Sequence, residues 1–167
     1  VWTWERTYDK SSIFNGLFLY RPDCMAEVSK VTMDLNRYAY EVEAIRDERR
    51  DVAILYSISS RVFQQEHMNS VYKTYEAVSY NGKRSLILNE ETIPERLLTD
   101  CDALIIPYAV HCKASAVDTI KKFIENGGKV LILGEGSLEF TEESVTKNDE
   151  AARLFILENS TVVPCTP

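Results

Sequence analysis

The segment from Ala103 to Gly136 limits the possible folds more than any other part of this sequence. Two apolar runs, Ala103–Ile106 and Lys129–Leu133, flank an amphipathic stretch at Ser115–Glu125, and this pattern predicts strand, helix and strand. Strands that are connected through a helix run parallel in one sheet. The second strand leads directly into Gly134-Glu135-Gly136. Because ligands and catalytic groups gather at the carboxyl ends of parallel strands, this turn is the first candidate for a functional site.

The same alternation of strands and helices extends over the whole sequence from residue 51 onward. Strands are predicted at 52–56, 85–88, 103–106, 129–133 and 161–163, and helices at 64–80, 93–98, 115–125 and 149–157. Right-handed crossovers between such strands produce a doubly wound parallel sheet with helices on both faces. Because only five strands fit, we expect an α/β fold with a flavodoxin-like strand order.

Residues 1–50 follow a different pattern. Two short strand-like pieces, at 1–5 and 16–20, come before Pro22 and Asp23, which fix the chain direction and offer an N-cap. A single amphipathic helix is then predicted to run to about Asp47, and the charged cluster at 46–50 is typical of a connector. We therefore expect two units, residues 1–50 with a strand and a long helix, and residues 51–167 with the parallel sheet.

The overall composition is that of one globular protein of 167 residues, 45% apolar and 27% charged. Its formal net charge of −7 argues against nucleic acid or an anionic membrane as a partner. No apolar run approaches the roughly 20 residues that span a bilayer. The four cysteines include no CxxC pair and the two histidines lie far apart, so we expect neither a metal site nor a disulfide framework.

The turn after the first predicted strand, Ser57 to Arg61, has no glycine that would let a cofactor phosphate approach a helix N-terminus. Its serine hydroxyls and backbone N–H groups are still able to hold an anion. We expect a plain connecting loop here and no cofactor.

Few residues at the carboxyl edge are candidates for catalysis. A nucleophile elbow, the sharp strand-to-helix turn of many hydrolases, carries Ser or Cys, whereas this chain has Gly134-Glu135-Gly136. Cys112 follows His111, but neighbours in an extended loop point apart, and a Cys–His dyad needs both groups within hydrogen-bond reach. Glu135 is either a carboxylate that neighbouring amides orient or an acidic residue that decorates a loop.

The first strand carries a separate signal. Trp2 and Trp4 alternate along it and therefore share one face, next to Glu5. Two indoles on one face suit a wall that stacks on a sugar, and they equally suit ordinary packing. A glycosidase needs two carboxylates about 5–9 Å apart, and this segment offers one.

Three stretches together resemble a known family. Val1–Trp4 followed by Gly16–Asp23 and a long helix resembles the last β/α unit of the catalytic (β/α)8 barrel in family 42 glycoside hydrolases, the bacterial β-galactosidases. Asp51–Tyr56 and the later Asp102–Pro107 and Asn126–Leu131 are similar to the domain that follows this barrel. That domain has the class I glutamine-amidotransferase-like fold and is known as the trimerisation domain.

The resemblance implies that the catalytic glutamates belong to barrel strands upstream of Val1, so we expect this chain to be an inactive fragment. Trp2, Trp4 and Glu5 would line the sugar site of the parent enzyme. The implied partners are the upstream barrel of the same polypeptide, further copies in a homotrimer, and a β-galactoside-like sugar. The implied location is the bacterial cytoplasm.

Gly134-Glu135-Gly136 would be a degenerate elbow, since amidotransferases proper have Cys in this turn. They also usually have glycines after the proline of the preceding strand, where this chain has Tyr108-Ala109. Two alternatives remain open: a divergent amidotransferase-like hydrolase that uses Cys112 or Glu135, and an α/β module that binds a small ligand.

Overall fold

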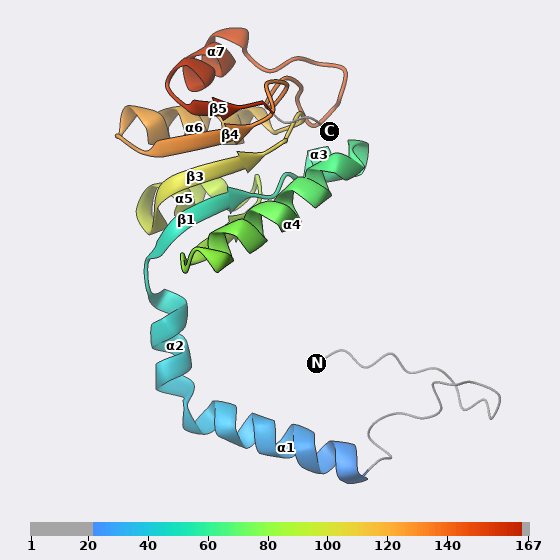
Figure 1. Cartoon of the computed structure of the whole chain (residues 1–167), viewed down its shortest axis with the longest axis vertical. Helices are drawn as coiled ribbons and strands as arrows, with labels where there is room; N and C mark the ends of the chain where they lie inside the picture. The colour runs from blue at the N-terminus through green and yellow to red at the C-terminus, as the bar shows by residue number, and fades with distance from the viewer. Residues whose placement is uncertain (1–21, 165–167) are drawn as a thin grey trace, which may run out of the picture. The chain divides into compact units, whose positions relative to one another are not determined.

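The computed structural model describes residues 22–164 (Figure 1). The chain divides into two compact units, residues 1–48 and residues 49–167, and each is described by itself. The strand-like pieces predicted at 1–5 and 16–20 lie outside the described residues, as do Trp2, Trp4 and Glu5. The barrel-like nature of residues 1–50 therefore stays a prediction.

In the described part of the first unit, residues 22–48, there are two helices where one was predicted, α1 (Pro22–Arg37) and α2 (Ala39–Asp47). The helix is interrupted at Tyr38, whose φ of −103° and ψ of 24° leave the α-helical range. Hydrogen bonds continue across the break, from Tyr38 N–H to Asp34 O and from Val42 N–H to Tyr38 O. The helix begins at Pro22, so Asp23 lies in its first turn and is not the N-cap. No residue of α1 is buried.

The second unit is a five-stranded sheet in which all pairings are parallel. Its strands are β1 (Arg50–Leu55), β2 (Ser85–Leu88), β3 (Cys101–Pro107), β4 (Lys129–Leu133) and β5 (Thr161–Val163), in the order β2-β1-β3-β4-β5. This order confirms the predicted flavodoxin-like α/β fold. Its helices are α3 (Ile58–Phe63), α4 (Gln65–Tyr80), α5 (Ile93–Asp100), α6 (Ala114–Glu125) and α7 (Glu150–Glu158).

The main hydrophobic core lies between the sheet and helices α5, α6 and α7. Side chains that alternate along the strands fill it, among them Leu104, Ile106, Val130 and Ile132, together with Ile156 of α7. Helix α4 packs against β1, β2 and β3 from the opposite side of the sheet (Figure 1). The crossovers thus place helices on both faces, as predicted for a doubly wound sheet.

The opposite face is covered unevenly. Ile54 of β1 is fully buried, but Leu131 and Leu133 of β4 are only partly buried and Val163 of β5 is 42% exposed. Buried parallel strands are normally apolar on both faces because helices cover both of them. In the part of the chain that the structure describes, the β4–β5 half of this face is the less covered one.

Helix α6 ends in a glycine cap. Gly127 has a φ of +87°, and its N–H donates to Ile124 O while the N–H of Gly128 donates to Phe123 O. These two bonds form a Schellman motif, which needs a left-handed residue after the helix. The cap turns the chain sharply into β4.

Candidate functional site

The carboxyl ends of the strands bring together several polar groups that are far apart in the sequence. Ser57 follows β1, Glu90 follows β2, His111 lies in the segment after β3, and Ser137 lies after β4. All four side chains are buried. In an open parallel sheet this edge is the default location of a functional site.

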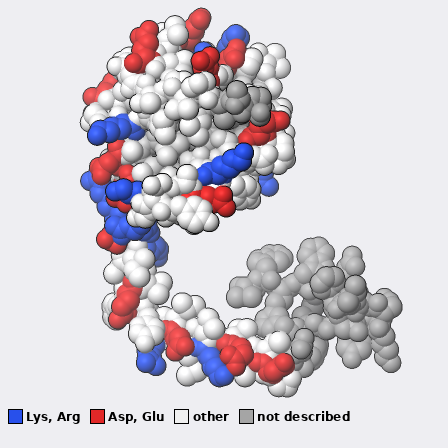
Figure 2. All heavy atoms as spheres, viewed as in Figure 1, with Lys and Arg blue, Asp and Glu red and all other residues white. Residues whose placement is uncertain are grey.

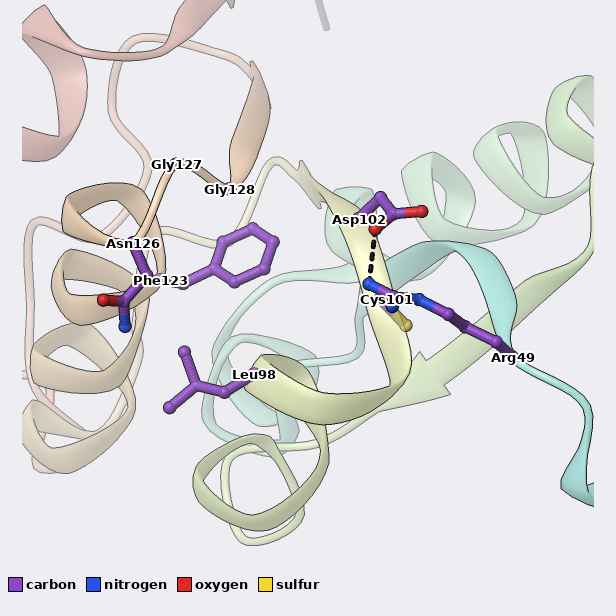
Figure 3. A pocket seen from close by; sticks show the side chains of 8 residues that line it. All are labelled: Arg49, Leu98, Cys101, Asp102, Phe123, Asn126, Gly127 and Gly128. Atoms are coloured by element: carbon purple, nitrogen blue, oxygen red, sulfur yellow. Dashed lines mark hydrogen bonds and ion pairs between the residues drawn. The ribbon is translucent and has the colours of Figure 1, made fainter.

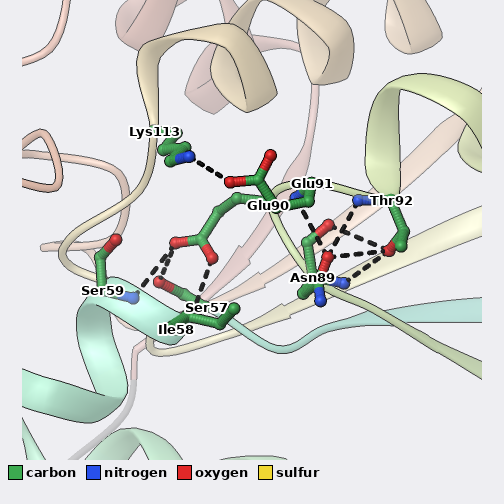
Figure 4. A network of polar contacts seen from close by, with 8 residues as sticks. All are labelled: Ser57, Ile58, Ser59, Asn89, Glu90, Glu91, Thr92 and Lys113. Atoms are coloured by element: carbon green, nitrogen blue, oxygen red, sulfur yellow. Dashed lines mark hydrogen bonds and ion pairs between the residues drawn. The ribbon is translucent and has the colours of Figure 1, made fainter.

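The carboxylate of Glu90 holds the start of helix α3 (Figure 4). Its Oε2 accepts the N–H of Ile58 at 2.8 Å, and its Oε1 accepts the N–H of Ser59 at 3.3 Å. The Ser57 hydroxyl lies 2.7 Å from the same Oε1. Glu90 is 2% exposed, and it satisfies N–H groups that the first turn of a helix cannot pair by itself.

The turn at Ser57–Arg61 was predicted as a plain connecting loop, and that prediction is wrong. Helix α3 begins at Ile58, and the Ser57 hydroxyl caps it by accepting the Ser60 N–H at 2.9 Å. A short helix with a serine cap has no hydrophobic periodicity, so the sequence pattern did not reveal it. The N–H groups that could have held a ligand anion here are bonded to Glu90 instead.

The two serines of this turn also hold the segment after β3. The Ser60 hydroxyl accepts the His111 N–H and donates to the His111 carbonyl oxygen, each at 2.8 Å. The Ser57 hydroxyl lies 2.7 Å from the same carbonyl, so its single proton can go either there or to Glu90. These bonds tie the ends of β1, β2 and β3 into one buried network.

His67 on α4 completes the network from the other side. Its Nε2 accepts the Ser57 N–H at 3.0 Å, and its Nδ1 lies 2.8 Å from the Pro107 carbonyl oxygen. A carbonyl can only accept, so Nδ1 carries the proton and the ring is neutral. Burial away from water lowers the pKa of His67, and this effect is larger than the opposite effects of the Pro107 carbonyl and Glu90, which raise the pKa. Both ring nitrogens are engaged in hydrogen bonds within the protein, so His67 is a packing residue and not a ligand.

Cys112 does not have the surroundings of a nucleophile. The residue is fully buried, and burial raises the pKa of its thiol well above the ordinary value, with a smaller contribution from Glu90. The centroid of the His111 ring lies 4.8 Å from that of the Phe63 ring and 5.5 Å from that of the Phe140 ring. The Nε2 atom of His111 is 3.1 Å from the Ser144 hydroxyl oxygen. Burial also lowers the pKa of His111. The geometry therefore favours an inert thiol over a Cys–His dyad.

The degenerate elbow is a tight turn with a steric constraint at its first position. Gly134 has a φ of +89°, and its N–H donates to Val163 O at 2.9 Å. A Cβ at this position would lie 2.3 Å from Cδ2 of Tyr108. At Gly136 a Cβ would meet only Val110, at an ordinary 3.8 Å. The fold therefore requires glycine at position 134 and not at position 136.

Glu135 is exposed on the outside of this turn. Its backbone carbonyl oxygen accepts a hydrogen bond from the Arg153 guanidinium at 2.7 Å. Because Glu135 is exposed, its carboxylate is not buried among backbone amides. The structure therefore favours the interpretation of Glu135 as a loop residue over that of an oriented catalytic carboxylate.

A pocket lies at the opposite, amino-terminal edge of the sheet (Figure 3). This pocket has a volume of about 280 Å³, and its lining includes Phe123, Leu98 and the glycine cap of α6. Arg49 and Asp102 form an ion pair at its rim and are both mostly exposed. It is an open depression away from the buried polar network, and no pattern in the sequence predicted it.

Three general features concern the described residues as a whole. Figure 2 shows their basic and acidic side chains interspersed on the visible face, where they form no extended basic surface. Within residues 22–164, no group of three or more His, Cys, Asp and Glu residues could hold a metal ion. No helix in the same range is long and apolar enough to cross a membrane.

The sequence pattern did not single out Glu90, and it marked Tyr108 only as a departure from the amidotransferase pattern, although a signal for the carboxyl edge existed for both. Glu90 comes two residues after the strand predicted at 85–88, and Tyr108 comes two residues after the strand predicted at 103–106. Every polar or bulky residue directly after a parallel strand belongs to the same edge. Applying that rule to all strands, and not only to the fourth, would have placed these residues at the edge.

The comparisons with known proteins support the fold. No protein-family model and no curated protein sequence matches the chain. The structure is similar to apo exo-carrageenase GH42 from Bacteroides ovatus, with a TM-score of 0.69 and 22% identity, over 89% of this chain and 20% of that chain. It is also similar to a β-galactosidase from Bifidobacterium adolescentis, with a TM-score of 0.55 and 20% identity, over 66% of this chain and 54% of that chain.

These similarities confirm, at the level of the fold, the resemblance that the sequence indicated. The matched part is 20% of the first protein's chain and 54% of the second's. At such low identity a common fold does not carry chemistry with it, so activity has to be argued from the residues of this chain.

Proposed function

We propose that this chain is part of a β-galactosidase-like glycoside hydrolase of the family 42 type. Residues 51–167 would form its non-catalytic amidotransferase-like domain, and residues 1–50 the terminal β/α unit of its catalytic barrel. The observation that carries the proposal is the structural similarity to apo exo-carrageenase GH42, which extends over 89% of this chain. The sequence resemblance covers both units and supports the same assignment.

The carboxyl edge supports a non-catalytic role for residues 51–167. The elbow position is Gly134, and the ring of Tyr108 occupies the space beside it. Cys112 is buried with a raised thiol pKa, and Glu135 is exposed. Glu90 is bonded to the start of α3 and so is not free to act on a substrate. The alternative of a divergent hydrolase that uses Cys112 or Glu135 gains no support from this geometry.

In the parent enzyme, the domain would serve assembly. Its partners would be the upstream barrel of the same polypeptide and two further copies in a homotrimer. The parent would cleave a β-galactoside-like or carrageenan-type glycan by the retaining two-carboxylate mechanism, with Trp2, Trp4 and Glu5 lining the sugar site. We expect this enzyme to act in the bacterial cytoplasm.

The purified 167-residue chain tests both parts of the proposal. Aryl β-galactosides and carrageenan oligosaccharides should be cleaved no faster than in a protein-free blank, and light scattering after gel filtration should give the mass of a trimer. Turnover that disappears in C112S or E135Q would establish the hydrolase alternative. A monomer at all concentrations tested would contradict the assembly role.

The same protein tests the ligand-binding alternative. A compound that binds only the native state raises the unfolding temperature in a concentration-dependent way. We expect no change in this temperature with galactose, galactobiose or inorganic phosphate, because the backbone N–H groups at the start of helix α3 are already bonded to Glu90. A saturable increase with any of them would favour the small-ligand module.

A further inference from the structure

The ring of Tyr108 lies against Gly134, where a side chain at position 134 would have to project. An ideal Cβ there would be 2.3 Å from Cδ2 and 2.9 Å from Cε2 of Tyr108. Carbon atoms that are not bonded do not approach this closely, so one of the two groups would have to move. Position 134 directly follows β4, where the nucleophile elbow of an amidotransferase-like fold carries its reactive side chain.

Tyr108 is held at this place in an unfavourable backbone conformation. Its φ is +47°, in the left-handed region that glycine adopts without cost and residues with a Cβ adopt with difficulty. The Tyr108 N–H donates to Leu133 O at 2.9 Å, which continues the β3–β4 pairing by one bond past Pro107 and Leu133. Strand β4 therefore holds Tyr108 in place through Leu133, and the same strand leads directly into Gly134.

We propose that Tyr108 is a plug that closes the turn after β4 to any side chain at position 134. The ring takes the volume that a nucleophile would need, so a single substitution of Gly134 cannot restore an elbow at this edge. The inference rests on the proposed non-catalytic role of the domain and identifies the residue that enforces it. It concerns packing alone, so it is testable without knowing the parent's substrate or its assembly.

The structure supplies a matched control for this proposal. Gly127 has a φ of +87°, almost the same as the +89° of Gly134, but a Cβ at Gly127 would meet nothing within 4 Å. G127A therefore measures the backbone cost of alanine in a left-handed position. G134A measures the same cost together with the clash against Tyr108.

The experiment is a set of urea unfolding curves for wild type, G127A, G134A, Y108G and Y108G/G134A. We expect G134A to lower the folding equilibrium constant at least about tenfold more than G127A does, as is typical of overpacking. In the Y108G background the effect of G134A should fall to that of G127A. Y108F keeps the ring, so the full effect of G134A should persist in a Y108F background.

Two outcomes would overturn the proposal. One is a G134A effect no larger than that of G127A, which would mean that the ring swings away freely. The other is an unchanged G134A effect in the Y108G background, which would place the clash elsewhere. Neither outcome bears on hydrolysis or trimer formation, so the proposed function would stand or fall separately.

Labelling gives a second readout of the same plug. The thiol introduced by G134C should react with a maleimide at least about tenfold faster in the Y108G background, because reaction of a covered thiol requires local opening. The wild-type chain, labelled in parallel, corrects for its own cysteines. Equal rates in the two backgrounds would contradict the plug even if G134A proved too unstable to measure.

Discussion

Replacing Glu90 by alanine is the sharpest test of the buried network at the carboxyl edge. The substitution removes the acceptor of the Ile58 N–H at 2.8 Å and of the Ser59 N–H at 3.3 Å. The Ser57 hydroxyl loses one partner but keeps the His111 carbonyl oxygen at 2.7 Å. The loss therefore falls mainly on the start of helix α3.

The size of the effect follows from these contacts. A hydrogen bond to a charged acceptor contributes about 1.5–3 kcal/mol, and the longer Ser59 bond belongs at or below the low end of that range. Neighbouring bonds are not additive, so we expect E90A to lower the free energy of unfolding by about 3 kcal/mol in all. With ordinary urea dependence this shifts the unfolding midpoint by about 1 M or more.

Glu91 provides the control, because it is the next residue and carries the same charge. It is exposed and pairs with Lys113 on the surface (Figure 4), so E91A should unfold close to the wild-type midpoint. E90Q keeps one acceptor oxygen but turns an amide NH2 group toward a backbone N–H. Its unfolding midpoint should therefore lie between those of E90A and E91A. If E90A is no less stable than E91A, the carboxylate does not hold α3 and the reasoning is refuted.

Three further predictions concern other buried groups. Because burial lowers the pKa of His67 in the folded state, the unfolded chain takes up a proton first as the pH falls. The free energy of unfolding should thus decrease below a pH of about 6.5, by up to about 1.4 kcal/mol per pH unit for this residue. Urea unfolding at pH 7.5 and 5.5 measures this, and H67Q should flatten the dependence. The buried thiol of Cys112 should react with a maleimide at least about 100-fold more slowly than that of Cys24, as labelling of single-cysteine variants would show; comparable rates would revive the nucleophile hypothesis. G128A should lower the unfolding temperature, because its Cβ would lie 2.4 Å from the ring of Phe123, with a cost of about 1–3 kcal/mol; an unchanged temperature would show that the ring yields.

The fold was predictable because its signals are local and repeated. The strands at 85–88, 129–133 and 161–163 were predicted at their observed bounds, since continuous apolar runs between turn residues are typical of buried parallel strands. The handedness of crossovers then leaves few possible strand orders. The kink at Tyr38 and the short helix α3 were missed, because neither changes the pattern of apolar residues.

The candidate site was less predictable. Gly134-Glu135-Gly136 was recognised as an elbow without a nucleophile, but the sequence could not show that Tyr108 fills the space beside it. Tyr108 and Gly134 meet because β3 and β4 pair in one register, with Pro107 opposite Leu133. The sequence distance between them is 26 residues, and no local pattern encodes that contact.

The sequence by itself determined the doubly wound sheet, its five strands and the absence of Ser or Cys at the elbow. Periodicity, turn residues and chirality act within a few residues or one crossover, so a single sequence contains them in full. Only the tertiary structure decided that Glu90 anchors helix α3, that His67 is neutral and that Tyr108 lies over Gly134. These outcomes depend on strand register and close packing between distant segments, where shifts of an ångström determine which atoms meet.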